Sequence, residues 1–185
     1  MTNLLKAHSS HLLVIDVQEK LLPQIEIADE LVGRCRRLIE IARHLDIGIT
    51  LSEHYKKGLG ETPFTIRELI KDGEVFEKIH FSCLGDERLK KRFQDLEQEG
   101  VLQITICGLE AHICVFQTAI ELKMAGFDVF VVADCVSARS KLSLERAWRR
   151  LELNNIAVID SEMAIFEWLG KAGTAEFKRI LPYLK

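Results

Sequence analysis

The sequence has no apolar run long enough to cross a bilayer, and its first residues lack the features of a secretory signal. A membrane-spanning helix needs about 18 consecutive apolar residues. A signal peptide needs a basic start, an apolar stretch and a small-residue cleavage site. MTNLLKAHSSHLLVID shows no such order and leaves little room for a transit peptide before the first predicted strand. We therefore expect a cytoplasmic protein without a membrane partner.

Cysteine and histidine patterns typical of disulfides or zinc sites are also missing. The chain has five cysteines, an odd number, and no pair forms a CxxC motif. An odd set without paired spacing argues against a disulfide framework and for a reducing compartment. Its six histidines form no HExxH motif and no cluster with zinc-ligand spacing. We expect no metal and no cofactor.

The chain has little excess charge and no repeats, low-complexity tracts or linkers. Its net charge is −3 and its sequence pI is about 6.1, which indicates no basic surface for nucleic acid. Hydrophobic residues make up 48% and charged residues 29% of the 185 positions. This composition is typical of one soluble globular domain, which we expect to cover residues 1–185.

Apolar strand-like segments alternate with amphipathic helical segments along the whole chain. Predicted strands cover 11–17, 47–53, 74–79, 101–108, 127–134 and 156–160. Predicted helices cover 27–45, 64–71, 86–100, 112–126, 143–155 and 161–170, with one more helix at the C-terminus and a polar loop at 54–63. This alternation predicts a three-layer α/β/α fold with a six-stranded, mostly parallel sheet of Rossmann-like order 3-2-1-4-5-6. Ligands of such sheets bind beyond the carboxyl ends of the strands, here between strands one and four.

Two ionisable residues lie at predicted strand ends. Asp16 follows the first strand in VIDVQEKL, where it could cap a loop or act as a general base in a dry crevice. Lys78 ends the third strand among apolar neighbours. It could extend its amine to solvent, or it could pair with Asp16. Gln18 lies on the same side as Asp16 and could orient that carboxylate or a substrate.

A cysteine, Cys114, lies in the first turn predicted for the helix that follows the fourth strand. Free cysteines are often buried and inert, so packing is one interpretation. The other is nucleophilic catalysis. Unpaired N–H groups at a helix start would stabilise a thiolate and could bind an oxyanion. His112 is expected to face away from Cys114. Taken alone, this position favours packing.

Three segments together indicate a family. VIDVQEK, EKIHFSCL and CGLEAHICVFQTA resemble the signature segments of isochorismatase-like cysteine hydrolases, a superfamily that includes nicotinamidases and N-carbamoylsarcosine amidohydrolases. The resemblance runs from the first strand to the helix at 161–168. The EHYKKGLG loop after the second strand is similar to that of the small isochorismatase domain-containing subgroup. The first strand is not followed by a glycine-rich loop, which argues against a nucleotide-binding module.

The resemblance implies a catalytic triad of Asp16 as general base, Lys78 as electrostatic partner and Cys114 as nucleophile. It also implies a cis peptide between Leu109 and Glu110, with the N–H groups of Glu110 and Cys114 forming the oxyanion hole. The implied reaction cleaves a C–N bond of a small amide or carbamoyl compound through a thioester. Homo-oligomerisation is implied as well. The alternative is a catalytically silent binding or scaffold protein.

One departure from the nicotinamidases concerns metal binding. They carry Asp-x-His after the second strand and a further histidine, whereas this chain has Ser52, Glu53 and His54, with no second histidine in the loop that follows. This argues against a metal site and against nicotinamide as substrate. Siderophore-type isochorismatases generally lack the cysteine, so Cys114 argues against vinyl-ether hydrolysis.

Several residues near the triad are candidates for the pocket wall. The substrate-pocket candidates are Gln18, His54, Tyr55, Phe81 and Cys83, together with the side chain of Glu110. The remaining cysteines are expected to be structural: Cys35 on a helix face, Cys107 inside a strand and Cys135 just after one.

Overall fold

A single parallel sheet organises the molecule. The computed structural model describes residues 4–184. The strands are β1 (Ser10–Ile15), β2 (Gly48–His54), β3 (Val75–Lys78), β4 (Gln103–Gly108), β5 (Asp128–Val136) and β6 (Ala157–Ile159). Their order is β3-β2-β1-β4-β5-β6, and every neighbouring pair is parallel. The predicted fold class and strand order are confirmed.

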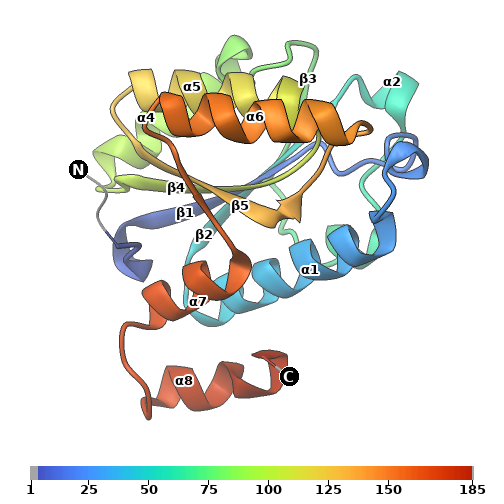
Figure 1. The fold of residues 1–185 in the computed structure, drawn as a ribbon. Helices are drawn as coiled ribbons and strands as arrows, with labels where there is room; N and C mark the ends of the chain where they lie inside the picture. The colour runs from blue at the N-terminus through green and yellow to red at the C-terminus, as the bar shows by residue number, and fades with distance from the viewer. Residues whose placement is uncertain (1–3, 185) are drawn as a thin grey trace.

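Helices cover both faces of the sheet, giving three layers (Figure 1). One face carries α1 (Ala28–His44) and α7 (Ser161–Leu169), with α8 (Ala175–Ile180) beyond them. The other face carries α4 (Glu87–Gln98), α5 (Phe116–Met124) and α6 (Lys141–Leu153). The short helices α2 (Lys56–Leu59) and α3 (Phe64–Arg67) lie between β2 and β3. No helix within residues 4–184 is both long and apolar enough to traverse a membrane.

The apolar strands reflect a sheet that is buried on both faces. Every residue of β1 and of β4 is buried. Along β1, Leu12 and Val14 join the apolar cluster beneath α1, whereas Leu13 and Ile15 join the cluster beneath α4, α5 and α6. Because successive side chains of a strand point to opposite faces, both sets must be apolar. The polar groups of a site can therefore gather at the ends of the strands.

Some predicted boundaries were wrong. A single helical turn, α2, lies inside the expected loop at 54–63, and the helix expected at 64–71 ends at Arg67. The helix expected from 112 begins with a π-helical turn, η4 (Ala111–Val115), before α5. Cys135 lies inside β5, because that strand continues past a register shift and pairs Val136 with Gly108. One-turn helices and register shifts leave little trace in hydrophobic periodicity.

Gly108, at the end of β4, allows β1 and β4 to approach closely. Its φ is +117°, and a Cβ added there would lie 2.0 Å from the carbonyl oxygen of Ile15. An alanine at this position would therefore have both an unfavourable backbone conformation and a clash with backbone that cannot move aside.

We expect Gly108→Ala to lower the free energy of unfolding by roughly 3–4 kcal/mol, the sum of a positive-φ cost and an overpacking cost. Urea unfolding followed by circular dichroism measures this change. Gly126→Ala is the matched control, because Gly126 has a φ of +102° but nothing within 4 Å of an added Cβ. Its cost should stay near 1–2 kcal/mol. Equal losses in the two variants would contradict the role given to the close approach.

Candidate active site

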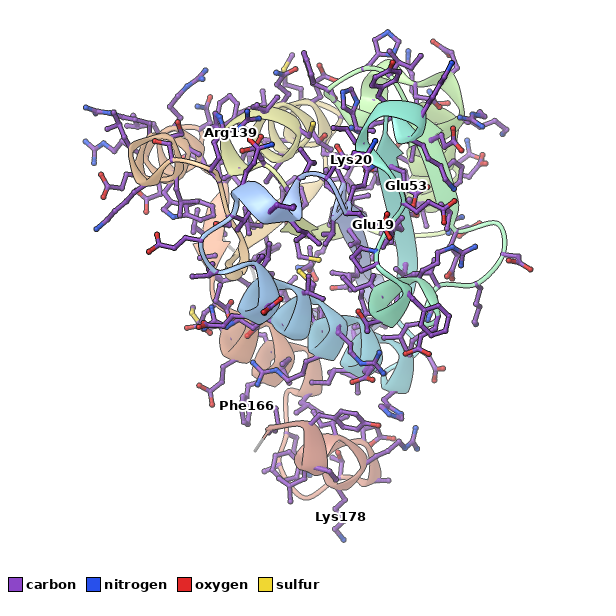
Figure 2. All side chains as sticks on the ribbon, turned by 90° about the vertical axis from the view of Figure 1, so that its right-hand side faces the viewer. Glu19, Lys20, Glu53, Arg139, Phe166 and Lys178 are labelled. Atoms are coloured by element: carbon purple, nitrogen blue, oxygen red, sulfur yellow. The ribbon has the colours of Figure 1, made fainter. Side chains whose placement is uncertain are left out.

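The three proposed catalytic residues come from two strand ends and from the turn after β4. Asp16 directly follows β1, Lys78 is the last residue of β3, and Cys114 lies in η4. In Figure 1 the arrowhead of β5 points to the right, and Figure 2 views the molecule from that side. The segment after Asp16, marked by Glu19 and Lys20, appears there between Glu53 and Arg139. This is the edge where ligands bind in open parallel sheets.

Asp16 and Lys78 form a fully buried ion pair. The Nζ atom of Lys78 lies 2.6 Å from Oδ2 of Asp16, and both side chains are 0% exposed. The amine also donates to the carbonyl oxygens of His80, at 3.2 Å, and Phe81, at 3.0 Å. Burial is the largest effect and favours the neutral amine, but the charge of Asp16, its hydrogen bond and the two neighbouring thiols together outweigh burial, so the pKa of Lys78 is raised. Lys78 therefore remains a cation in this environment.

Ser52 provides the second contact that orients Asp16. Its Oγ donates to Oδ1 of Asp16 at 2.6 Å, and its carbonyl oxygen accepts from the Asp16 N–H at 3.0 Å. Both residues are 0% exposed. The contact follows from the sheet register, which pairs Ile15 with Ser52. Asp16 has a φ of +50°, uncommon for a residue other than glycine, and these bonds hold it there.

The thiol of Cys114 is protonated at rest. Cys114 is 6% exposed, and burial together with the negative charge of Asp16 raises its pKa far above the usual range for a thiol, although Lys78 opposes the shift. The expectation that the helix start would stabilise a thiolate here is therefore wrong. Burial and the charge of Asp16 outweigh the effects that favour the thiolate. A base must remove the proton before Cys114 can attack.

The Leu109–Glu110 peptide is cis, and the side chain of Glu110 turns toward the loop after β5. Its Oε1 accepts from the backbone N–H of Arg139 at 3.1 Å and from Nε of Arg139 at 2.9 Å, while Oε2 pairs with Nη2. Burial alone would raise the pKa of Glu110, but the bonds from Arg139 hold it below its usual value. The Ala111 N–H donates to the carbonyl oxygen of Ser137 at 2.8 Å. These hydrogen bonds join the loop after β4 to the loop after β5.

Two pocket candidates have other partners. Gln18 donates from Nε2 to the carbonyl oxygen of Gly60 at 2.7 Å and accepts at Oε1 from the His54 N–H at 2.7 Å. It therefore fastens the loop after β2 rather than orienting Asp16. The carboxylate of Glu110 accepts hydrogen bonds from Arg139 and is therefore not free to contact a substrate.

The other candidates surround the ion pair at different depths. The rings of His54 and Phe81 are 5.3 Å apart, and burial followed by the charge of Lys78 lowers the pKa of His54. Cys83 is fully buried, and burial raises the pKa of its thiol to about 11. Tyr55 is 53% exposed and precedes α2. Of these four residues, Tyr55 lines a cavity of about 460 Å³ that also includes Lys78.

Two residues of functional interest were missed or misread at the level of sequence. Ser52 was considered only as a lost metal ligand, and Arg139 was not considered. Ser52 lies two residues before the end of β2, so its place beside Asp16 follows from the sheet register, which the sequence pattern does not give. Arg139 gives no signal either, because its contact joins two irregular loops.

Two of the three residues at the position that resembles the nicotinamidase metal site have other contacts, whereas Nδ1 of His54 is buried without a hydrogen-bond partner among the described residues. Ser52 bonds to Asp16, and Glu53 accepts from the Thr62 N–H at 2.8 Å and pairs with Lys56 at 3.2 Å. Within the part of the chain that the structure describes, no three His, Cys, Asp or Glu side chains are grouped to hold a metal ion.

The fold and this edge of the sheet define a parallel α/β protein with a buried Asp16–Lys78 pair and with the thiol of Cys114 in the turn after β4. A family model described as the Isochorismatase domain matches residues 10–163, so the chain belongs to this family. Membership supports a hydrolase-type function in general terms.

Named relatives extend this result. The chain is 34% identical over 172 residues to isochorismatase domain-containing protein 1 of Salmo salar, covering 92% of this chain but only 59% of that protein. It is 30% identical over 181 residues to the secreted isochorismatase effector Isc1 of Phytophthora sojae, covering 96% and 85%. The structure of MAR1 ribonuclease from Caenorhabditis elegans superimposes with a TM-score of 0.90 at 31% identity, covering 98% and 92%.

Proposed function

We propose that this chain is a cysteine hydrolase that cleaves the C–N bond of a small amide or carbamoyl compound through a thioester. The observation that carries the proposal is the buried Asp16–Lys78 pair, whose charges act directly on the thiol of Cys114. A base, a fixed cation and a nucleophile in one dry environment are the parts that acyl transfer requires.

The proposed reaction begins with proton transfer from the Cys114 thiol to Asp16. Lys78 remains charged beside both groups and balances the negative charge as it moves. The thiolate attacks the substrate carbonyl carbon, and the N–H groups of Glu110 and Cys114 donate to the resulting oxyanion. Asp16 then gives its proton to the departing nitrogen. It next takes a proton from the water that attacks the thioester and returns this proton to the departing sulfur, which releases the acid and restores the thiol of Cys114.

A panel of small primary amides and carbamoyl compounds tests the proposal. Intact-mass analysis after a rapid quench should show an acyl adduct on the chain, and digestion should place it on Cys114. Ammonia or amine release measures turnover. Binding without adduct or release, for every compound, would instead support a silent binding protein.

RNA is a competing substrate class, because the C. elegans structure is named as a ribonuclease. Here the proposed base is 0% exposed and the proposed nucleophile 6% exposed, a depth that suits a small molecule better than a polymer backbone. We expect an RNA oligomer to remain intact under conditions in which an amide is turned over.

We also propose a cytoplasmic homo-oligomer. All five cysteines are free and buried, which suits a reducing compartment. Light scattering on the purified chain measures its assembly, and fractionation of the source cells measures its location.

Ser52 is proposed as a positioning residue for Asp16. We expect Ser52→Ala to lower kcat about 10- to 100-fold with little change in KM, since a hydrogen bond to a charged group is worth about 1.5–3 kcal/mol. Steady-state kinetics separates the effect on kcat from that on KM. Ser52→Thr keeps the hydroxyl and should retain most activity; an unchanged kcat in the alanine variant would count against this role.

A further inference from the structure

A cavity lies between the turn after β4 and helix α6, and it does not include the proposed catalytic residues. Its volume is about 350 Å³, with His112 and Phe116 on one wall and Leu142, Ser143, Arg146 and Arg150 on the other. Pockets for small ligands have volumes of roughly 300–1,000 Å³. Cys114, two residues after His112, does not line this cavity.

The polar side chains around this cavity can all donate hydrogen bonds. Two guanidinium groups, an imidazole and a hydroxyl line it, and no carboxylate does. Neither Arg146 nor Arg150 forms an ion pair with another residue of the described chain. The cavity therefore presents positive charge that no described residue neutralises.

An aromatic contact positions Arg150 at the cavity wall, and His112 has a buried ring nitrogen without a partner. The guanidinium carbon of Arg150 lies 4.0 Å from the centre of the Phe116 ring, a cation–π contact that fixes the planar group at the cavity wall. The Nδ1 atom of His112 is buried and has no hydrogen-bond partner among residues 4–184. A buried polar atom without a partner is unfavourable unless a ligand or water satisfies it.

We propose that this cavity binds a small organic anion, with a carboxylate or phosphate group on a compact apolar body. The fork of a guanidinium matches the paired oxygens of such groups, and Nδ1–H of His112 can supply a further donor. Phe116, buried, and Leu142, 62% exposed, offer the apolar surface for the body of the ligand. This site is independent of the proposed hydrolase chemistry.

Calorimetric titration of the full chain with benzoate, phenyl phosphate and inorganic phosphate tests the site, with benzyl alcohol as the neutral analogue. We expect at least one aromatic anion to bind at millimolar concentration or below and the alcohol not to bind. Arg146→Gln and Arg150→Gln should each weaken binding about 10-fold or more. Arg149→Gln makes the same charge change on the same helix, but Arg149 does not line the cavity, so binding should be unchanged.

Three results would overturn the proposal. They are no binding of any anion, equal weakening by all three arginine variants, and loss of oligomeric assembly in Arg146→Gln or Arg150→Gln by light scattering. The last result would make the cavity an interface between copies of the chain. Thermal unfolding of each variant establishes that lost binding does not reflect lost folding.

Discussion

Cys114→Ala is expected to abolish turnover of any amide that the wild-type chain hydrolyses, with a loss on the order of 10³-fold or more. Without the sulfur no thioester can form, and the remaining groups can only bind and polarise the substrate. The acyl adduct should vanish from the intact-mass spectrum at the same time. Because Cys114 is small and buried, its replacement by alanine should leave the fold intact.

Cys83→Ala is the matched control for this variant. Cys83 is also a buried thiol near Lys78 and Asp16, and burial raises its pKa to about 11. It lies outside η4, in the 3₁₀ turn η3 (Cys83–Gly85), and its N–H donates to Thr118 at 3.0 Å. We expect this variant to keep turnover and the acyl adduct. If Cys114→Ala kept its activity while Cys83→Ala lost it, the nucleophile would be misassigned.

Asp16 and Cys114 could be found from the sequence because they follow the buried, largely apolar strands β1 and β4, whereas Lys78 ends β3, which is only partly buried. Buried apolar strands are easy to locate, and the parallel topology brings the carboxyl ends of all the strands to one edge. The fold class followed from the same pattern. Strand order then placed Asp16 between the other two positions.

Side-chain contacts at this edge were less predictable. Gln18 was expected to face the substrate, but it bonds to the backbone of His54 and Gly60. That choice depends on the path of a loop that hydrophobic periodicity does not describe. The raised pKa of Cys114 likewise depends on burial and on a neighbouring charge, so only the folded arrangement could correct the expectation of an ionisable thiol.

Asp16→Asn is expected to separate turnover from thiol reactivity. Turnover should fall about 10²- to 10⁴-fold, because the base that moves the proton is lost. Alkylation of Cys114 by iodoacetamide should become faster at neutral pH. Burial and the charge of Asp16 both raise the pKa of this thiol, so replacing the carboxylate should lower that pKa, although the effect of burial remains. Mass-spectrometric labelling rates from pH 6 to 10 measure the shift.

In the wild-type chain the pKa of Cys114 lies well above the usual value, so its labelling rate should still be rising at the alkaline end of this range. In Asp16→Asn the same rise should occur at lower pH, since the thiolate forms more readily. Slower labelling of the variant at every pH would show that Asp16 also acts as the base for alkylation, and the electrostatic account would be wrong.

Loss of the buried Asp16 charge also lowers stability, so Asp16→Asn is compared with a second variant that removes both charges of the pair. Breaking a buried ion pair by removing one partner costs about 3–5 kcal/mol, because the other charge is left uncompensated. The double variant Asp16→Asn with Lys78→Met removes both charges and should recover much of that loss. Its turnover should stay low, and its Cys114 labelling should slow again, because no cation remains to favour the thiolate. This combination of restored stability and absent catalysis would assign the ion pair to chemistry rather than to folding.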